Sequence, residues 1–158
     1  MARANEAQSP RPLPADPGAW TAWASDLPAS MFMHIRPSYV EPGRAVARLE
    51  DSIWPLNPSG AVHGGLVLAV ADHVGGMSAM TVMEPGEFCA TATLASQFLR
   101  PAILPLEFDA TVMRSGRTLA FVSLDVVGRD GRLCTKFSGT WSLNLLRPPK
   151  PGAAPSRT

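Results

Sequence analysis

The pattern of apolar positions changes along the chain and divides it into one helical part and several extended parts. Residues 65–82 are apolar on almost every side, which predicts a long helix that other elements must cover. Ahead of this segment, Ala45, Ala47 and Leu49 recur at every second position, the period of a strand with one buried face. An earlier extended segment is expected at residues 31–39.

Extended segments also follow the predicted helix. Prolines, glycines and the hairpin signal Asp130-Gly131 divide this part of the chain into four strands. These strands are expected at residues 89–99, 106–114, 118–127 and 133–145. Short turns between successive strands favour antiparallel pairing. The pattern therefore predicts an α+β fold in which a six-stranded antiparallel sheet wraps around one long central helix.

Proline-rich segments at both ends predict the limits of the folded domain. Residues 1–16 and 147–158 combine proline with small and charged residues, a composition typical of disorder, and leave 17–146 as the domain. Asp16-Pro17 has the pattern of a helix N-cap followed by a first-turn proline. Pro28 is expected to end this short helix.

Charge and composition exclude several classes of partner. With 14 basic and 13 acidic residues the net charge is +1, so no general attraction to nucleic acid or a membrane surface is expected. No apolar run reaches the roughly 18–20 residues that span a bilayer, and the N-terminus lacks the apolar stretch of a secretory signal. Cys89 and Cys134 are interpreted as reduced thiols, and the histidines lack the spacing of a metal site. We therefore expect a soluble cytoplasmic protein without a metal.

Asp72 lies in the middle of the predicted apolar helix. Removing a carboxylate from water there is costly, because desolvation disfavours its charged form. Asp72 could cap or pair with a group inside the fold. We favour the alternative that it is a functional residue, since costly ionisable groups gather at functional sites.

The turn His63-Gly64-Gly65 at the start of the same helix is a second candidate. The first amides of a helix have no partner within it, so an N–H at this point can stabilise a developing oxyanion. A plain turn between loop and helix is the simpler interpretation. Gly64 and Asp72 are about 12 Å apart along a helix, too far to act on one carbonyl carbon. If they act together, two chains related by a two-fold axis must each supply one of them, which predicts a homo-oligomer.

Three segments of the chain form a recognisable set. The first is residues 57–65, Asn-Pro-Ser-Gly-Ala-Val-His-Gly-Gly, with Asp72 nine positions after the histidine. The others are 97–102, Gln-Phe-Leu-Arg-Pro-Ala, and 114–120, Arg-Ser-Gly-Arg-Thr-Leu-Ala. Together they resemble the hotdog-fold acyl-CoA thioesterases, and most closely their phenylacetic-acid-degradation (PaaI-like) branch, over about residues 30–146. It implies a hotdog fold and hydrolysis of an acyl- or aryl-CoA thioester to the free acid and coenzyme A.

The resemblance also implies a role for each matching residue. Asp72 would be either the general base that activates water or the nucleophile that forms an anhydride. The Gly64 amide would polarise the thioester carbonyl, and His63 would shape that turn. Asn57 would orient the carbonyl or the water. Thr91, at a position where the family often has serine or threonine, would assist the water.

Further substrate contacts are expected from three arginines and two glycines. They are Arg100, Arg114 and Arg117, with Gly65 and Gly116. Arginine suits the phosphates of coenzyme A, although charged ends of hairpins at a solvated edge are the simpler interpretation. Coenzyme A is part of the substrate, so no separate cofactor is implied. The family includes dimers and dimers of dimers, with the active site at the subunit interface.

Two other functions are compatible with the same fold. One is a hotdog hydratase or dehydratase acting on an enoyl thioester, against which the spacing of Asn57, His63 and Asp72 argues. The other is a non-catalytic module that binds acyl chains or a small aromatic ligand. Such a module gains nothing from an uncompensated acid at Asp72.

Overall fold

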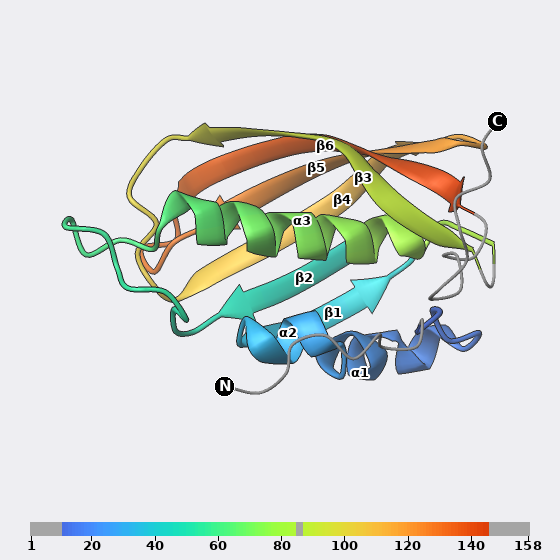
Figure 1. Ribbon diagram of the computed structural model, residues 1–158, viewed down its shortest axis with the longest axis horizontal. Coiled ribbons are helices and arrows are strands. Elements are labelled where there is room, and N and C mark those ends of the chain that lie inside the picture. Colours follow the sequence, from blue (N-terminus) through green and yellow to red (C-terminus); the bar gives the residue numbers. More distant parts are fainter. Residues whose placement is uncertain (1–10, 85–86, 146–158) are drawn as a thin grey trace, which may run out of the picture.

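A computed structural model of the chain describes residues 11–84 and 87–145. Within them, one antiparallel sheet of six strands curves around a long helix, α3 (Figure 1). The strands lie in the order β1-β2-β4-β5-β6-β3, so β1 and β3 form the two edges. The bounds are Ile35–Glu41 (β1), Arg44–Leu49 (β2), Gly64–Met80 (α3), Phe88–Phe98 (β3), Leu106–Ser115 (β4), Leu119–Val127 (β5) and Leu133–Leu145 (β6). The predicted α+β architecture is confirmed.

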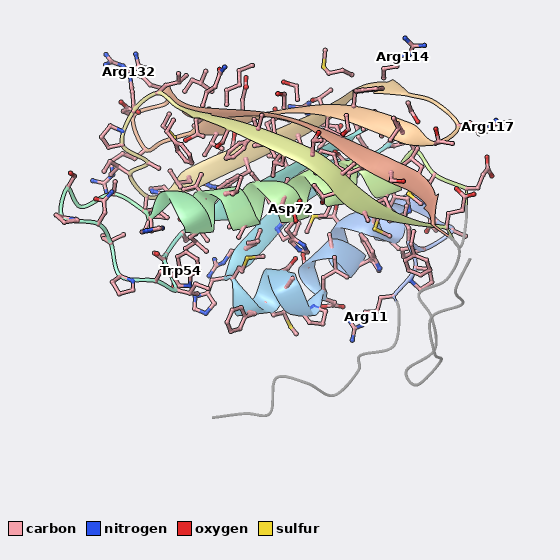
Figure 2. The ribbon with its side chains drawn as sticks, turned by 45° about the horizontal axis from the view of Figure 1, so that its top comes forward. Arg11, Trp54, Asp72, Arg114, Arg117 and Arg132 are labelled. Atoms are coloured by element: carbon pink, nitrogen blue, oxygen red, sulfur yellow. The ribbon has the colours of Figure 1, made fainter. Side chains whose placement is uncertain are left out.

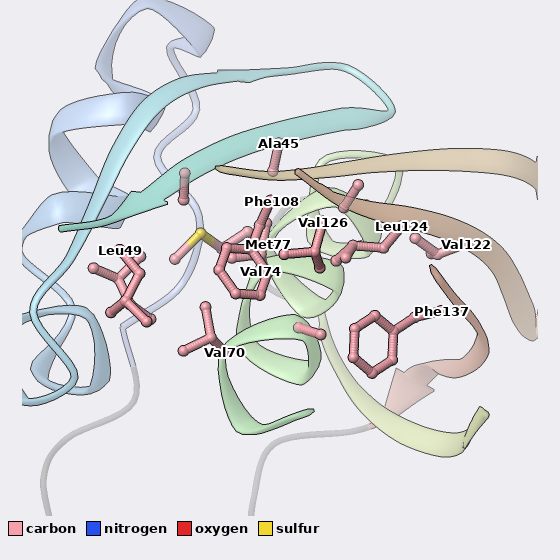
Figure 3. Close-up of a cluster of buried hydrophobic side chains, with 14 of the residues drawn as sticks. Ala45, Leu49, Val70, Val74, Met77, Phe108, Val122, Leu124, Val126 and Phe137 are labelled. Atoms are coloured by element: carbon pink, nitrogen blue, oxygen red, sulfur yellow. The ribbon is translucent and has the colours of Figure 1, made fainter. Parts of the chain in front are cut away.

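The core lies between α3 and the concave face of the sheet. The alternation seen in β2 is confirmed, because Ala45, Ala47 and Leu49 are each 0% exposed. Figure 3 shows side chains of α3 and of the sheet meeting in this core. The helix is held by burial of an apolar surface. Its one fully buried polar side chain, Ser78, donates to the Gly75 carbonyl at 2.8 Å.

The N-terminal segment differs from its prediction. The Asp16 side chain accepts a hydrogen bond from the Gly18 amide at 2.9 Å, so the predicted N-cap is confirmed. It opens a 3-10 turn, η1 (Pro17–Ala19), which leads into α1 (Trp20–Ser25). Pro28 does not end a helix but begins a second one, α2 (Pro28–Phe32), and β1 starts only afterwards. Proline is accepted at the first position of a helix, because the N–H it lacks has no partner there in any case.

The predicted disordered ends fall mainly outside the described residues, which exclude 1–10 and 146–158. Residues 11–16 of the predicted arm lie beside α1, where Trp20 Nε1 donates to the Pro14 carbonyl at 2.8 Å. In the described part of the chain, no helix has the length and apolar character needed to cross a membrane.

The Trp141 indole packs against α3 where the helix has two consecutive glycines. Trp141 is 2% exposed. A Cβ on Gly75 would lie 2.5 Å from the indole Cη2, closer than real atoms approach, whereas a Cβ on Gly76 would lie 3.5 Å from the indole Nε1. The contact with Trp141 therefore requires glycine at position 75 but not at position 76.

This difference predicts opposite effects of two matched substitutions. Gly75→Ala is expected to lower the free energy of unfolding by about 2–3 kcal/mol, because the buried ring cannot move away from the new methyl group. Gly76→Ala is expected to be neutral or to raise it by about 0.5–1 kcal/mol through the higher helix propensity of alanine. Urea unfolding followed by circular dichroism measures both. Equal stabilities of the two variants would contradict the packing described.

Candidate active site

Asp72 is held by a side chain from the edge strand of the sheet. It lies in the middle of α3 and is half-buried (Figure 2). Thr91 on β3 donates from Oγ1 to Asp72 Oδ1 at 2.6 Å. This short hydrogen bond to a carboxylate orients it and leaves its other oxygen, Oδ2, for another partner. The structure therefore brings together two of the residues expected at the site.

A bulge in β3 gives Thr91 this direction. Thr91 pairs with Trp141 and Thr93 with Thr140, so two steps along β3 match only one along β6. Residues two apart on a regular strand share a face, but here Thr93 Oγ1 bonds to Thr140 Oγ1 at 2.7 Å while Thr91 bonds to Asp72. The bulge thus directs one threonine to the helix and the other to the outer face.

The two threonines make a matched test of the site. Thr91→Val is expected to lower kcat for the thioester hydrolysis that the motifs imply by about 10–100-fold, because Asp72 loses the group that orients it. Thr91→Ser is expected to retain most of the rate. Thr93→Val removes a hydroxyl from the same strand and is expected to change kcat less than twofold. A similar loss in both valine variants would show that the hydroxyl acts through strand stability.

A cavity of about 210 Å³ adjoins Asp72 and Thr91. Its remaining walls are mostly apolar and come from α1, α3, β3 and β6, including Trp23, Met77 and Trp141. Cys89 also lines it, and burial raises the pKa of that thiol to about 11, so the thiol is protonated and uncharged at neutral pH. Sequence reasoning missed Trp141 and Cys89 here, because they reach this cavity only through the packing of β3 and β6 against α3.

His73 contacts α2 and also lines the cavity at Asp72. Its Nε2 shares a hydrogen bond with Ser30 Oγ at 2.9 Å, and Ser30 is 0% exposed. Burial lowers the pKa of His73 from 6.5 to about 4, although the nearby Asp72 carboxylate acts in the opposite direction. His73 is therefore neutral at physiological pH and ties α3 to α2.

This shift predicts a loss of stability in acid. As the pH falls below about 6.5, the unfolded chain binds a proton at His73 before the folded chain does, so the free energy of unfolding decreases toward pH 4. The full decrease from this residue is about 3 kcal/mol. Urea unfolding between pH 4 and 7.5 measures it, and His73→Gln is expected to flatten the profile. An unchanged profile in the variant would show that other groups cause the acid sensitivity.

The start of α3 presents an amide without a hydrogen-bond partner among the described residues. His63 is the N-cap, and its Nδ1 accepts from the Gly65 amide at 3.0 Å. The His63 carbonyl accepts from the next two amides of the helix, at Leu66 and Val67. These bonds leave the Gly64 N–H without an acceptor, as expected for a first helical amide.

Gly64 lines a second cavity, of about 430 Å³, together with Asn57, Phe98 and Arg100. The Phe98 ring lies 3.3 Å from the place where a Cβ on Gly64 would be, so glycine allows this close contact. Asn57 Oδ1 accepts from the Ser59 and Ala61 amides at 2.9 and 3.0 Å and thereby holds the loop. Only the amide NH₂ of Asn57 is left to contact substrate or water.

The cavities at Gly64 and at Asp72 are separate within one chain. The cavity at Gly64 does not include Asp72 or Thr91, and the cavity at Asp72 does not include Gly64 or Asn57. The helical rise predicts about 12 Å between the two residues, which agrees with this separation. One chain thus contains two halves of a site that do not meet.

The arginines expected at the substrate also fall into two places. Arg114 and Arg117 lie at the turn between β4 and β5, at the end of the sheet opposite Arg132 (Figure 2). Arg100 follows β3 at the other end, where its Nη1 donates to the Leu133 carbonyl at 2.9 Å. The end of β3 near Arg100 pairs with β6 at Thr135, and the start of β5 after Arg117 pairs with β6 at Ser142. These two positions on β6 are seven residues apart, which corresponds to about 20 Å along the strand. Within one chain, Arg100 therefore lies far from Arg114 and Arg117.

Arg129 and Arg132, which sequence reasoning missed, lie beside Arg100 around a third cavity of about 220 Å³. In the sequence these two arginines are marked only by the hairpin between β5 and β6. The hairpin does not indicate that the end of β3, with Arg100, lies next to it.

Comparison with known proteins decides the family. The sequence model of the thioesterase superfamily matches residues 59–135, which include Gly64, Asp72 and Thr91. A protein of Saccharolobus solfataricus that carries the name of an inferred esterase is 30% identical over 111 residues, covering 70% of this chain and 79% of its own length. The chain belongs to the thioesterase superfamily.

Other members of the thioesterase superfamily support the same assignment. Human acyl-coenzyme A thioesterase 13 is 28% identical over 90 residues, covering 56% of this chain and 64% of its own length. A thioesterase family protein from Silicibacter pomeroyi superposes with a TM-score of 0.73 at 23% identity, over 81% of this chain and 98% of that one. A Streptococcus pneumoniae protein described as a hypothetical thioesterase and solved with coenzyme A gives a TM-score of 0.63 at 21% identity, over 72% and 88% of the two chains. The hotdog fold implied by the motifs is confirmed.

Proposed function

We propose that this thioesterase-superfamily member hydrolyses an acyl- or aryl-CoA thioester to the free acid and coenzyme A. The observation that carries the proposal is the hydrogen bond from Thr91 to Asp72 beside a largely apolar cavity. It supplies an oriented carboxylate next to space for an acyl group. The relation to human acyl-coenzyme A thioesterase 13 and the coenzyme A bound by the Streptococcus pneumoniae neighbour support coenzyme A as the thiol.

Asp72 acts on the thioester carbonyl carbon by one of two routes. As a general base, it takes a proton from water, whose oxygen attacks the carbon while the thiolate of coenzyme A leaves and is then protonated. As a nucleophile, its own oxygen attacks, the thiolate leaves, and water hydrolyses the resulting anhydride. In both routes negative charge develops on the carbonyl oxygen. The unpaired Gly64 amide is the donor that stabilises this charge, and Asn57 contributes its NH₂ group.

The separation of the two half-sites is explained by a dimer with a two-fold axis. Gly64 of one chain and Asp72 of its partner then form one site, and the same pair with the chains exchanged forms the other. Two features of α3 and β3 support this assembly. Leu68, one turn from both residues on α3, is 37% exposed, and Phe98 at the end of β3 is 53% exposed.

The edge of the sheet supports the same assembly. β3 spans 11 residues, carries no charge and no proline, and has no neighbour on its outer side within the described residues. In monomeric proteins, edge strands usually carry charged residues or proline, because an edge without them can pair with the edge strand of another chain. Pairing of β3 with the β3 of a second copy removes both bare edges.

The same two-fold pairing brings the arginines together. Antiparallel pairing of the edge strands places the Arg100 end of one sheet beside the Arg114 and Arg117 end of the other. We propose that these arginines, with Gly116 in their turn, contact the phosphates of coenzyme A. The dimer is the smallest assembly that meets these conditions, and a dimer of dimers meets them equally.

Release of free thiol from a panel of acyl-CoAs tests the proposal. The panel contains short, medium and branched alkanoyl groups, phenylacetyl and hydroxylated aryl groups, and an enoyl-CoA assayed for hydration. Thiol release above the buffer rate for at least one member is the expected result. Hydration of the enoyl-CoA without thiol release would instead favour a hydratase, and binding without turnover would favour a non-catalytic module.

A further inference from the structure

Positive charge is concentrated around one cavity beside the β5–β6 hairpin, called the hairpin cavity below. It has a volume of about 220 Å³, and among the described residues that line it are Arg100, Arg129 and Arg132 with one acid, Asp130. Three arginines and one aspartate give these walls a charge of +2, although the whole chain carries only +1. A cleft lined mainly by one sign of charge attracts ligands of the opposite sign.

Two of these arginines are held in place by neutral acceptors. Arg129 Nε donates to the Leu104 carbonyl at 2.8 Å, and Arg100 Nη1 donates to the Leu133 carbonyl at 2.9 Å. A carbonyl oxygen fixes the position of a guanidinium group but does not neutralise its charge. The two cations are therefore preorganised and still able to attract an anion, which lowers the entropy lost when a ligand binds.

The direction of the existing contacts leaves the terminal edges of two guanidinium groups for a ligand. Arg129 uses its Nε for the Leu104 carbonyl, and the Nε of Arg132 is the atom that lies 3.9 Å from Asp130 Oδ2. Within the described part of the chain, the two Nη groups of Arg129 and of Arg132 donate no hydrogen bond. This pair of Nη groups is an edge with which arginine can hold two oxygens of one anion.

Asp130 does not block the hairpin cavity. Its Oδ1 accepts from the Arg132 backbone amide at 3.1 Å, which ties the carboxylate to the turn. The side chains of Arg132 and Asp130 are 71% and 58% exposed, and such an exposed ion pair contributes at most about 1 kcal/mol. A ligand with two negative charges can therefore replace Asp130 beside Arg132 at little cost.

Charge and volume favour a phosphate group as the ligand. The excess of two positive charges in the walls matches a phosphate dianion better than a single carboxylate. A water molecule takes about 30 Å³ of liquid volume, so the cavity has room for a phosphate group and a few waters. The rest of a larger molecule would extend into solvent.

The hairpin cavity differs from the arginine group proposed for coenzyme A. It is complete within one chain, whereas Arg100 meets Arg114 and Arg117 only through a second copy. In the sheet order β5-β6-β3, the hairpin lies on the inner side of Arg100, and the proposed partner lies beyond β3 on the other side. Arg100 is the residue that the two sites share, and it also lines the cavity at Gly64.

We propose that the hairpin cavity binds a phosphate dianion, either free phosphate or the phosphomonoester of a small molecule other than the substrate. The bound phosphate and the phosphates of coenzyme A then compete for the Arg100 guanidinium group. Occupation of the cavity therefore weakens the binding of acyl-CoA and leaves the chemical step unchanged. The binding site goes beyond the proposed function, and only its effect on KM rests on that function.

Isothermal titration calorimetry with inorganic phosphate, and separately with phenyl phosphate, tests the site in the wild-type protein. A dissociation constant of about 0.5–5 mM is expected at low salt. Arg132→Gln is expected to weaken binding by about tenfold, and the fold is kept because this side chain is exposed and pairs only with Asp130. Arg48→Gln, the matched control on β2, is expected to keep the wild-type affinity. Absence of phosphate binding to the wild type, or equal losses in the two variants, would overturn the site.

Steady-state hydrolysis of an acyl-CoA measures the competition at Arg100. Adding about 10 mM phosphate at constant ionic strength is expected to raise KM about threefold or more, with kcat unchanged. Sodium chloride of the same ionic strength is expected to have no such effect. Arg132→Gln is expected to keep its kcat and to lose most of the response to phosphate. A wild-type KM that phosphate does not change would overturn the competition.

Acyl-CoA compared with acyl-dephospho-CoA, which lacks the 3′-phosphate, shows whether the cavity serves the substrate itself. The ratio of the two KM values is expected to be the same in the wild type and in Arg132→Gln. If Arg132→Gln raises KM for acyl-CoA alone, the cavity holds the phosphate of the substrate, and a separate site is overturned. A wild type that binds phosphate but hydrolyses no acyl-CoA overturns the thioesterase proposal and supports the phosphate site.

Discussion

Asp72→Asn is expected to lower kcat for acyl-CoA hydrolysis by about 10³-fold, whichever chemical route Asp72 follows. Asparagine has nearly the same shape and can still accept the Thr91 hydrogen bond, so the fold and the cavity are kept. It can neither take a proton from water nor attack the carbonyl carbon efficiently. Thiol release under saturating substrate measures the loss, and an unchanged melting temperature shows that the fold is intact.

A second carboxylate provides the control for Asp72. Asp109 on β4 accepts two hydrogen bonds from Arg44, at 2.9 and 2.7 Å, on the outer face of the sheet. Asp109→Asn removes the same chemical group at a distance from the cavity and is expected to leave kcat within twofold. If Asp72→Asn retained wild-type activity, Asp72 would be a structural residue and the chemistry would have to be sought elsewhere.

Gly64→Pro is expected to lower kcat by about 10²–10³-fold, because it removes the single N–H proposed to stabilise the oxyanion. Proline is well accepted here, since Gly64 is the first residue of α3 and His63 before it has the extended conformation that proline requires. Gly64→Ala keeps the N–H and adds a Cβ near Phe98, so it controls for steric effects. Comparison of kcat in the two variants measures the contribution of the amide. An equal loss in both would assign the effect to crowding at Phe98.

Combining the two defective chains tests whether the site is shared between subunits. In a heterodimer of an Asp72→Asn chain and a Gly64→Pro chain, one site has both changes and the other has neither. Heterodimers purified through two different tags are therefore expected to regain about half of the wild-type turnover per dimer. Both homodimeric variants stay nearly inactive. No recovery in the heterodimer would mean that Gly64 and Asp72 do not cooperate across an interface.

Local periodicity and helix capping explain which parts of the fold could be predicted from the sequence. The two-residue period of β2, the apolar run of α3 and the Asp16 cap depend on residues close together in the chain, whose geometry is nearly invariant. The distance of about 12 Å between Gly64 and Asp72 could be predicted for the same reason, since both residues lie on one regular helix. The error at Pro28 arose where the local signal is ambiguous, because proline can either precede or begin a helix.

The residues of the candidate site could be predicted from the sequence only where they belong to a motif. The spacing from Asn57 to Asp72 identified residues that line two cavities, but it could not indicate that the side-chain oxygen of Asn57 holds the loop. The arginines formed one group in the sequence analysis, while the sheet places Arg100 and Arg114 at opposite ends.

What the sequence by itself determined is therefore the six strands and the long helix, their order, and the position of Asp72 in the middle of that apolar helix. Only the tertiary structure decided that Thr91, and not Thr93, reaches this carboxylate, because a bulge depends on the pairing of β3 with β6. The tertiary structure also placed Trp23 of α1 and Trp141 of β6 in the wall of the cavity that adjoins Asp72. Such contacts join residues far apart in the chain, and their geometry is set by packing across the whole core, which no local pattern specifies.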